Sequence, residues 1–289
     1  MIGAAKAFLY EEPLDVTDID INLTTDVAST VNSLQVYRDD RGYLGRATLN
    51  ATSSTARNFH LTLPSGSFLI DKATERGIYV RPDIRSKNNG GISNTMVQID
   101  SVTFKGHGAW SSQNYTKASA SHDVYLPFVT SRSVIKRILN AGEKNAALVT
   151  GKDRTIASFQ FEGRSPDTAT RLAITDLSFT IEQTGDVQLS NARLLIPGIS
   201  DAFYCTTTTQ RVQCDGLPDS FGAISDGFRT MQVVADIFAL DPLHASVRLT
   251  LNEPGNPYGI GSVQWSDGTS AFTWVPFTQP VVEGTMWKY

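Results

Sequence analysis

The two cysteines are the residues of this chain with the most distinctive chemistry, because thiols can bind metals, act as redox pairs or form disulfides. Cys205 and Cys214 are the only cysteines among 289 residues, in the stretch "YCTTTTQRVQC". Two thiolates cannot complete a zinc site, and the spacing is not the two-residue spacing of redox pairs. A disulfide is therefore the favoured prediction, with two free thiols as the alternative. A disulfide would place the chain in an oxidising compartment.

Three aspartates near the second cysteine are the candidate metal ligands. Asp215, Asp219 and Asp226 lie within twelve residues around a glycine-rich loop, and calcium prefers oxygen ligands on such loops. The loop does not follow the Asp-x-Asp-x-Asp-Gly pattern, so ordinary turn aspartates are the favoured interpretation. Calcium is the only cofactor that this pattern suggests.

Four aromatic residues near the end of the chain are the candidate ligand platform. Tyr258, Trp265, Phe272 and Trp274 follow one another closely. Exposed aromatic rings there could stack on sugar rings or anchor a protein partner. Phe272 and Trp274 are two residues apart and share a strand face, which favours a place in the core instead.

Motifs of catalysis are missing from the sequence. It contains no Gly-x-Ser-x-Gly, His-Glu-x-x-His or phosphate-binding loop, and its four histidines, His60, His107, His122 and His244, lack ligand spacing. We therefore predict that the chain is not an enzyme. The net charge of −4 argues against nucleic-acid binding, and no apolar run is long enough for a membrane helix. The N-terminus lacks a signal-peptide core, so the chain is either intracellular or a piece of a longer protein.

Strands are the elements that must position these residues. Polar and apolar residues alternate strictly from Asp18 to Leu23, as on an antiparallel strand with one buried face. Segments with frequent β-branched residues are separated by turn signals such as "DDRG", "NNGG" and "PGNP". Only Arg132–Leu139 fits a helix as well as a strand.

The pattern of strands recurs about 150 residues later in the chain. Asp18–Leu23 matches Asp176–Ile181 at an offset of 158, and "YLPFVT" from Tyr125 matches "WVPFTQ" from Trp274 at an offset of 149. The matches between these two join Leu34–Tyr37 to Ala192–Leu195, Ile78–Ile84 to Met231–Ile237, and Val97–Ile99 to Val247–Leu249. Five collinear matches predict a tandem duplication.

The predicted fold is all-β, with two tandem immunoglobulin-like antiparallel β-sandwich domains. The first occupies residues 1–130, the second 155–289, and residues 131–154 form a linker or connecting strand between them. In the first domain Tyr43–Leu49 and Arg57–Leu63 are expected to form a hairpin. The duplication aligns that hairpin with the cysteine stretch, which places Cys205 and Cys214 at cross-strand distance.

The repeated segments resemble the immunoglobulin-like modules of bacterial cell-surface and surface-layer proteins. The matching positions are Val16–Leu23, Val31–Tyr37 and Ile78–Ile84 in the first copy, and Leu172–Ile181, Leu189–Leu195 and Met231–Ile237 in the second. The resemblance implies a structural or adhesive role and no catalytic residues.

These observations predict a non-enzymatic structural segment of an extracellular surface protein, such as a surface layer, stalk, fibre or adhesin. The expected partners are other copies of the chain or neighbouring repeat domains. A carbohydrate-binding or adhesin module that recognises cell-surface glycan is the first alternative, and a viral or filament coat subunit is the second.

Overall fold

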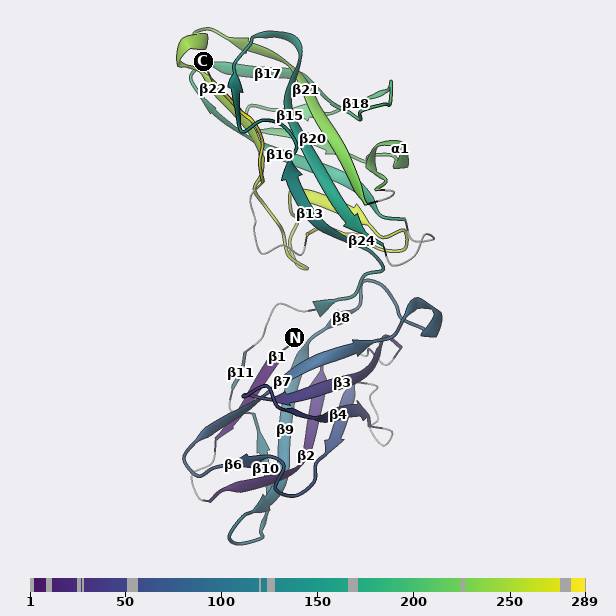
Figure 1. The fold of residues 1–289 in the computed structure, drawn as a ribbon, viewed down its shortest axis with the longest axis vertical. Coiled ribbons are helices and arrows are strands. Elements are labelled where there is room, and N and C mark those ends of the chain that lie inside the picture. The colour runs from purple at the N-terminus through teal and green to yellow at the C-terminus, as the bar shows by residue number, and fades with distance from the viewer. Residues whose placement is uncertain are drawn as a thin grey trace. The chain divides into compact units, whose positions relative to one another are not determined.

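Strands make up nearly all of the regular structure in the computed structural model (Figure 1). The structure describes residues 3–8, 12–24, 27, 29–50, 57–119, 121–123, 128–165, 171–224, 227–275 and 282–288. The helical elements within these ranges are single turns: η1 (Lys87–Asn89), α1 (Asp219–Gly222) and η2 (Pro242–His244). The predicted all-β class is confirmed. Among the described residues, no helix combines the length and the apolar character needed to cross a membrane.

The chain divides into two compact units, Met1–Thr130 and Ser131–Tyr289. Residues 131–154, which the sequence suggested as a linker or connecting strand, contain β13 (Val134–Asn140), β14 (Asn145–Ala147) and the beginning of β15 (Gly151–Arg164). This segment belongs to the second unit. The stretch that fitted a helix or a strand, Arg132–Leu139, lies largely in β13. Residues 124–127 and 276–281, which hold most of the last repeat match, are outside the described residues.

The first unit is an antiparallel sandwich whose two sheets meet at β4. One sheet has the order β11-β1-β7-β3-β4, and the other has the order β10-β9-β2-β5-β4, with β6 beside β2. A two-residue pairing joins β8 to β12. The strands are β1 (Gly3–Phe8), β2 (Leu14–Leu23), β3 (Val31–Arg38), β4 (Tyr43–Leu49), β5 (Asn58–Thr62), β6 (Leu69–Ile70), β7 (Glu75–Ile84), β8 (Met96–Val97), β9 (Ile99–Gly108), β10 (Asn114–Ala118), β11 (Ser121–Asp123) and β12 (Phe128–Val129).

The second unit also has two sheets. The first has the order β13-β15-β21-β17-β18, and the second has the order β14-β26-β22-β16-β20-β19, with β23 beside β16 and β24, and β25 beside β22. Among the described strands, only β14 and β26 pair in parallel. The remaining strands are β16 (Ala173–Thr184), β17 (Val187–Leu195), β18 (Ala202–Tyr204), β19 (Thr206–Thr207), β20 (Arg211–Asp215), β21 (Phe228–Ala239), β22 (Ser246–Leu251), β23 (Val263–Ser266), β24 (Ala271–Phe272), β25 (Val282–Glu283) and β26 (Met286–Lys288).

Strands of the two units pair in the same order. The series β1-β7-β3-β4 corresponds to β15-β21-β17-β18, and the series β5-β2-β9 corresponds to β20-β16-β22. The immunoglobulin order places the first strand beside the second and the last beside the sixth. Among the strands common to both units, β1 and β15 instead lie beside β7 and β21, and β9 and β22 lie beside β2 and β16. Both units therefore differ from the immunoglobulin order by the same exchange of two strands.

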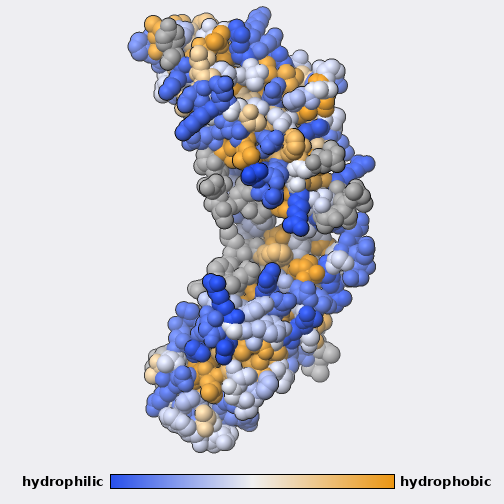
Figure 2. Space-filling model, in the orientation of Figure 1, coloured by the Kyte–Doolittle hydropathy of each residue, from blue (hydrophilic) through white to orange (hydrophobic). Residues whose placement is uncertain are grey.

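Alternation along the strands builds the core of each unit. In β2 the side chains of Ile19, Ile21 and Leu23 are completely buried, and in β16 Leu177 and Phe179 are equally enclosed. The polar residues between them point to the outer faces. On the side shown in Figure 2, hydrophilic residues cover most of both units and hydrophobic residues form scattered patches.

An aspartate in the matched strands β7 and β21 holds a bulge of the neighbouring strand in each unit. Asp236 accepts hydrogen bonds from the side chain of Asn191 at 2.7 Å and from the backbone of Asp153 at 2.9 Å. The pairing of β21 shifts register beside both residues. In the first unit Asp83 accepts bonds from Asn32 at 3.1 Å and Ser33 at 3.2 Å, beside a shift in β3. The repeated "DI" therefore has a structural role.

Glu12 fixes the hairpin between β9 and β10. Its buried carboxylate accepts hydrogen bonds from the backbone of Trp110 at 2.9 Å and Ser111 at 3.0 Å, from the Tyr115 hydroxyl at 2.8 Å, and from the Ser111 hydroxyl. The Ser111 hydrogen bond, opposed by burial and supported by the backbone and Tyr115 bonds, lowers the pKa of Glu12 from 4.5 to about 2.

The stability of the first unit should therefore fall as the pH drops from 4.5 to about 2. A carboxyl group whose folded pKa is lowered stabilises the fold above its unfolded pKa and loses that effect on protonation. We expect Glu12→Gln to lower the melting temperature of the first unit at pH 6 and to flatten its acid dependence. Melting curves from pH 2 to 6 measure both effects. Glu75→Gln is the matched control, and an equal change in that variant would contradict the assignment.

Candidate functional site

The cysteine stretch lies where the second unit passes from one sheet to the other. Cys205 and Cys214 form a disulfide, with their Cα atoms 4.5 Å apart. The Cys205 backbone donates to Ala192 of β17 in one sheet at 2.9 Å, whereas Cys214 belongs to β20 in the other. Thr206 of β19 pairs with Gln213 of β20, and the two cysteines are the neighbouring residues, Cys205 before Thr206 and Cys214 after Gln213. The bond therefore joins the two sheets at their edge.

The four aromatic residues do not form one exposed platform. Trp265 and Phe272 are opposite each other on β23 and β24, are 2 % and 3 % exposed, and stack with ring centroids 4.2 Å apart. The Trp265 indole donates to the Trp274 carbonyl at 2.7 Å. Trp274 is half-buried, and only Tyr258 is largely exposed, at 70 %. Alternation directs the rings of Trp265 and Phe272 into the core, so these two candidate platform residues offer no exposed ring to a ligand.

Two of the three candidate calcium ligands, Asp215 and Asp219, lie in the described part of the chain. Asp215 ends β20, and Asp219 forms an ion pair with Arg171 at 3.3 Å. Asp226 lies outside the described residues. Within the described ranges, no group of three or more His, Cys, Asp or Glu side chains is arranged to hold a metal ion.

A polar cluster that the sequence did not reveal surrounds His60 on β5. Its Nδ1 lies 2.8 Å from Asp20, and its Nε2 lies 3.1 Å from the Thr62 hydroxyl and 3.2 Å from Asp18. Burial raises the pKa of Asp20, but hydrogen bonds from Lys105 and His60 outweigh it and hold that pKa below its usual value. Thr62 itself donates to Asp18 at 3.3 Å. Asp20, His60 and Thr62 follow one another as the acid, base and hydroxyl of a catalytic triad do. However, the Asp18 carboxylate contacts both His60 and Thr62, on the side where a substrate would have to approach the hydroxyl.

A shallow groove crosses the outer face of β16, β20 and β23 in the second unit. Its volume is about 160 Å³. Arg211 crosses the groove, donating to Glu253 at 2.9 Å and to the Ser178 hydroxyl at 3.5 Å. The lining consists of polar side chains and one apolar edge: Asp176, Leu177, Ser178, Arg211, Gln213, Asp215, Glu253, Ile260, Gly261 and Gln264. Hydroxyl, amide, guanidinium and carboxylate groups together suit a neutral ligand with several hydroxyl groups.

The loop beside this groove presents Tyr258 at a fixed point. Asn256 and Gly259 exchange two backbone hydrogen bonds of 3.2 and 3.0 Å, so Pro257 and Tyr258 form the tip of a tight turn. Ile260, two residues further on, lines the groove and is 69 % exposed. Tyr258 is the one predicted platform residue whose ring remains accessible. The sequence did not point to the groove residues, because most of them are polar residues at the outward positions of alternating strands, where polar residues are ordinary.

Comparisons with known proteins do not identify a family. No family model and no curated protein sequence matches the chain. Among solved structures, a protein from Eubacterium rectale described as secreted covers 99 % of this chain and 69 % of its own length, at 10 % identity and a TM-score of 0.25. A lectin from Pleurotus ostreatus in complex with GalNAc covers 96 % and 80 %, at 10 % identity and a TM-score of 0.23. These TM-scores are too low to support an argument.

Proposed function

We propose that the chain is a non-enzymatic structural segment of an extracellular surface protein, such as a surface layer, stalk or fibre. The observation that carries the proposal is the common strand order of the two consecutive units. A repeated sandwich is the building block of arrays in which each unit acts as a rigid element. The partners are then neighbouring repeat domains or further copies of the chain.

The disulfide supports the extracellular setting of this proposal. Cys205 and Cys214 are bonded, and disulfides persist mainly in oxidising environments outside the cytosol. A covalent bond between the two sheets of the second unit also resists their separation when a pulling force acts on a surface protein.

Mechanical unfolding of the single chain, tethered at both ends, tests the structural role. We expect two separate unfolding events, one for each unit. Opening the disulfide with a reductant should lengthen only the second unit's event, by about 25 Å, because a separation of nine residues spans roughly 30 Å when extended and the bonded Cα atoms are already 4.5 Å apart. Gradual extension without resolved events would overturn the proposal.

Carbohydrate binding is the second candidate function, and the groove beside Tyr258 is the observation that favours it. The groove offers several hydrogen-bonding groups, and the turn at Asn256–Gly259, which carries the exposed Tyr258, leads directly into the groove residues Ile260 and Gly261. A sugar bound there would form hydrogen bonds with Arg211 and Gln213 and would stack one face on the tyrosine.

Tyr258→Ala should weaken binding of glycans to this groove about tenfold, which corresponds to the loss of roughly one aromatic contact. A glycan array followed by titration calorimetry measures the change. Tyr204→Ala is the matched control, because Tyr204 is 74 % exposed in the same unit but lies on β18, in the sheet that does not contain the groove strands β16, β20 and β23. Glycan binding that is identical in both variants would exclude the groove as the site.

A further inference from the structure

A missing side chain creates a hollow on the outer face of the first unit. In the sheet of β1, β7 and β3, Gly77 pairs with Lys6 on one side, and its carbonyl accepts a hydrogen bond from the Asp39 backbone at 3.0 Å on the other. Gly77 belongs to the outward positions of β7, together with Glu75 and Tyr79. Because it has no Cβ, the backbone is the floor between Lys6 and Asp39.

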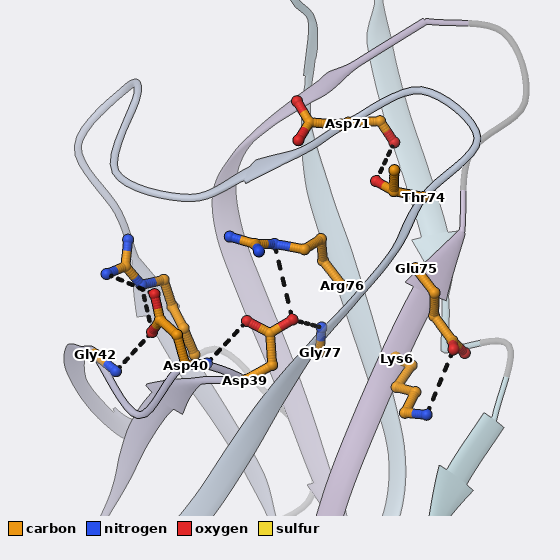
Figure 3. A network of polar contacts seen from close by, with 10 residues as sticks. Lys6, Asp39, Asp40, Gly42, Asp71, Thr74, Glu75, Arg76 and Gly77 are labelled. Carbon is orange, nitrogen blue, oxygen red and sulfur yellow. Dashed lines mark hydrogen bonds and ion pairs between the residues drawn. The ribbon is translucent and has the colours of Figure 1, made fainter.

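The hollow has charged walls and one aromatic wall. Its volume is about 220 Å³, and it is lined by Ala4, Lys6, Asp39, Glu75, Gly77, Ile78 and Tyr79. Figure 3 shows Lys6 and Glu75 on one side of Gly77, and Asp39 with Arg76 on the other. Tyr79 lies one outward position further along β7, between Ala4 of β1 and Tyr37 of β3.

Asp39 is held in place by the protein itself. One carboxylate oxygen accepts the Asp40 backbone N–H at 3.0 Å, and the other accepts the Gly77 N–H at 3.3 Å and lies 3.7 Å from the Arg76 Nε. A carboxylate fixed by backbone donors does not need to be ordered when a ligand arrives, which reduces the entropy cost of binding.

Lys6 and Glu75 form an adaptable pair at the opposite wall. Their charged atoms are 3.4 Å apart, and the side chains are 44 % and 46 % exposed. A contact of this length between exposed side chains stabilises the fold very little. Either group can therefore turn to a ligand hydroxyl without a large loss of stability.

We propose that this hollow binds a single neutral sugar ring. The ammonium and carboxylate groups provide donors and acceptors for neighbouring hydroxyls, and the Tyr79 ring provides a surface for the C–H face of a sugar. Lys6 pairs with Glu75, and Arg76, which lies just outside the lining, approaches Asp39 at 3.7 Å, so each carboxylate of the hollow already has a cation beside it. The volume lies below the roughly 300 Å³ at which pockets for drug-sized molecules begin. The site is separate from the groove of the second unit and independent of the structural role.

Nuclear magnetic resonance can test whether a sugar binds in the hollow, because the backbone amides at its floor can be observed directly. The full chain, labelled with ¹⁵N, is titrated with the methyl glycosides of glucose, galactose, mannose and N-acetylglucosamine. We expect at least one of them to shift the amide signals of Gly77 and Asp40 in a saturable way. Saturable binding of all four without any shift at these amides would overturn the proposal, as would the absence of binding.

Three variants separate this site from its surroundings. Tyr79→Ala should weaken binding at least fivefold by removing the aromatic wall. Gly77→Ala should also weaken it, because the added Cβ would meet the Ala5 carbonyl at 3.1 Å and the Lys6 Cγ at 3.2 Å. Tyr43→Ala, at a tyrosine 58 % exposed outside the lining, is the matched control and should bind as the wild type does.

The groove of the second unit is distinguished by the same titration. Tyr258→Ala should leave the Gly77 signal unchanged even if it abolishes binding to the groove. If Gly77→Ala does not fold, the two variants of Tyr79 test the site. Tyr79→Ala should then weaken sugar binding, whereas Tyr79→Phe, which keeps the aromatic ring, should bind as the wild type does. Equal affinity in Tyr79→Ala and the wild type would overturn the assignment.

Discussion

Replacing Trp265 by alanine should destabilise the second unit by about 3–5 kcal/mol and leave the first unit unchanged. The indole is 2 % exposed and stacks on Phe272, so its removal opens a large cavity in the core. It also leaves the Trp274 carbonyl without the indole donor that now lies 2.7 Å away. Both losses fall within Ser131–Tyr289.

Denaturant titration of the whole chain can resolve this effect, because the first unit provides an internal reference. We expect the transition of the second unit to move to a lower denaturant concentration, while that of the first unit stays in place. Trp110→Ala is the matched control, since Trp110 is 70 % exposed in the first unit. A glycan-binding defect in a stable Trp265→Ala variant would contradict the core role and restore this residue to a ligand platform.

Trp265 also shows how far the sequence alone could lead. Alternation along the chain predicts strands and their buried faces, and it correctly describes Ile19, Ile21 and Leu23. It does not show which strands are neighbours. The stack of Trp265 on Phe272 depends on the pairing of β23 with β24, which the six residues between these two positions do not determine. The sequence hides for the same reason that β1 and β15 lie beside β7 and β21, and that β9 and β22 lie beside β2 and β16.

The candidate sites were still harder to predict, because they form across strands that are distant in sequence. The hollow over Gly77 needs Lys6 from β1 and Asp39 from the turn after β3. A glycine within a strand usually suggests a bulge or a close approach of backbones. Likewise, Glu12 and its donor Ser111 are 99 positions apart, so the sequence does not show that this carboxylate is buried and hydrogen-bonded. Sequence patterns show the local alternation within one strand, whereas these sites depend on which strands pair and on the register of that pairing.

Opening the disulfide between Cys205 and Cys214 should destabilise the second unit by about 2.5–3 kcal/mol, since the bond closes a loop of roughly ten residues. For a unit of this size the melting temperature should fall by roughly 5–10 °C. The double variant Cys205→Ser, Cys214→Ala and the reduced wild type should agree. Calorimetry with and without reductant measures the shift, and the first unit, which has no cysteine, is the reference.

The physical reason for this sensitivity lies in the corresponding strand of the first unit. There β4 continues without a break from its pairing with β3 at Ala47 to its pairing with β5 at Thr48, so the backbone itself joins the two sheets. In the second unit the strand is interrupted at Cys205, between β18 and β19. We therefore expect the disulfide to replace the continuity that β4 provides. A reduced second unit that melts at the temperature of the oxidised one would show that β19 and β20 hold the edge without it.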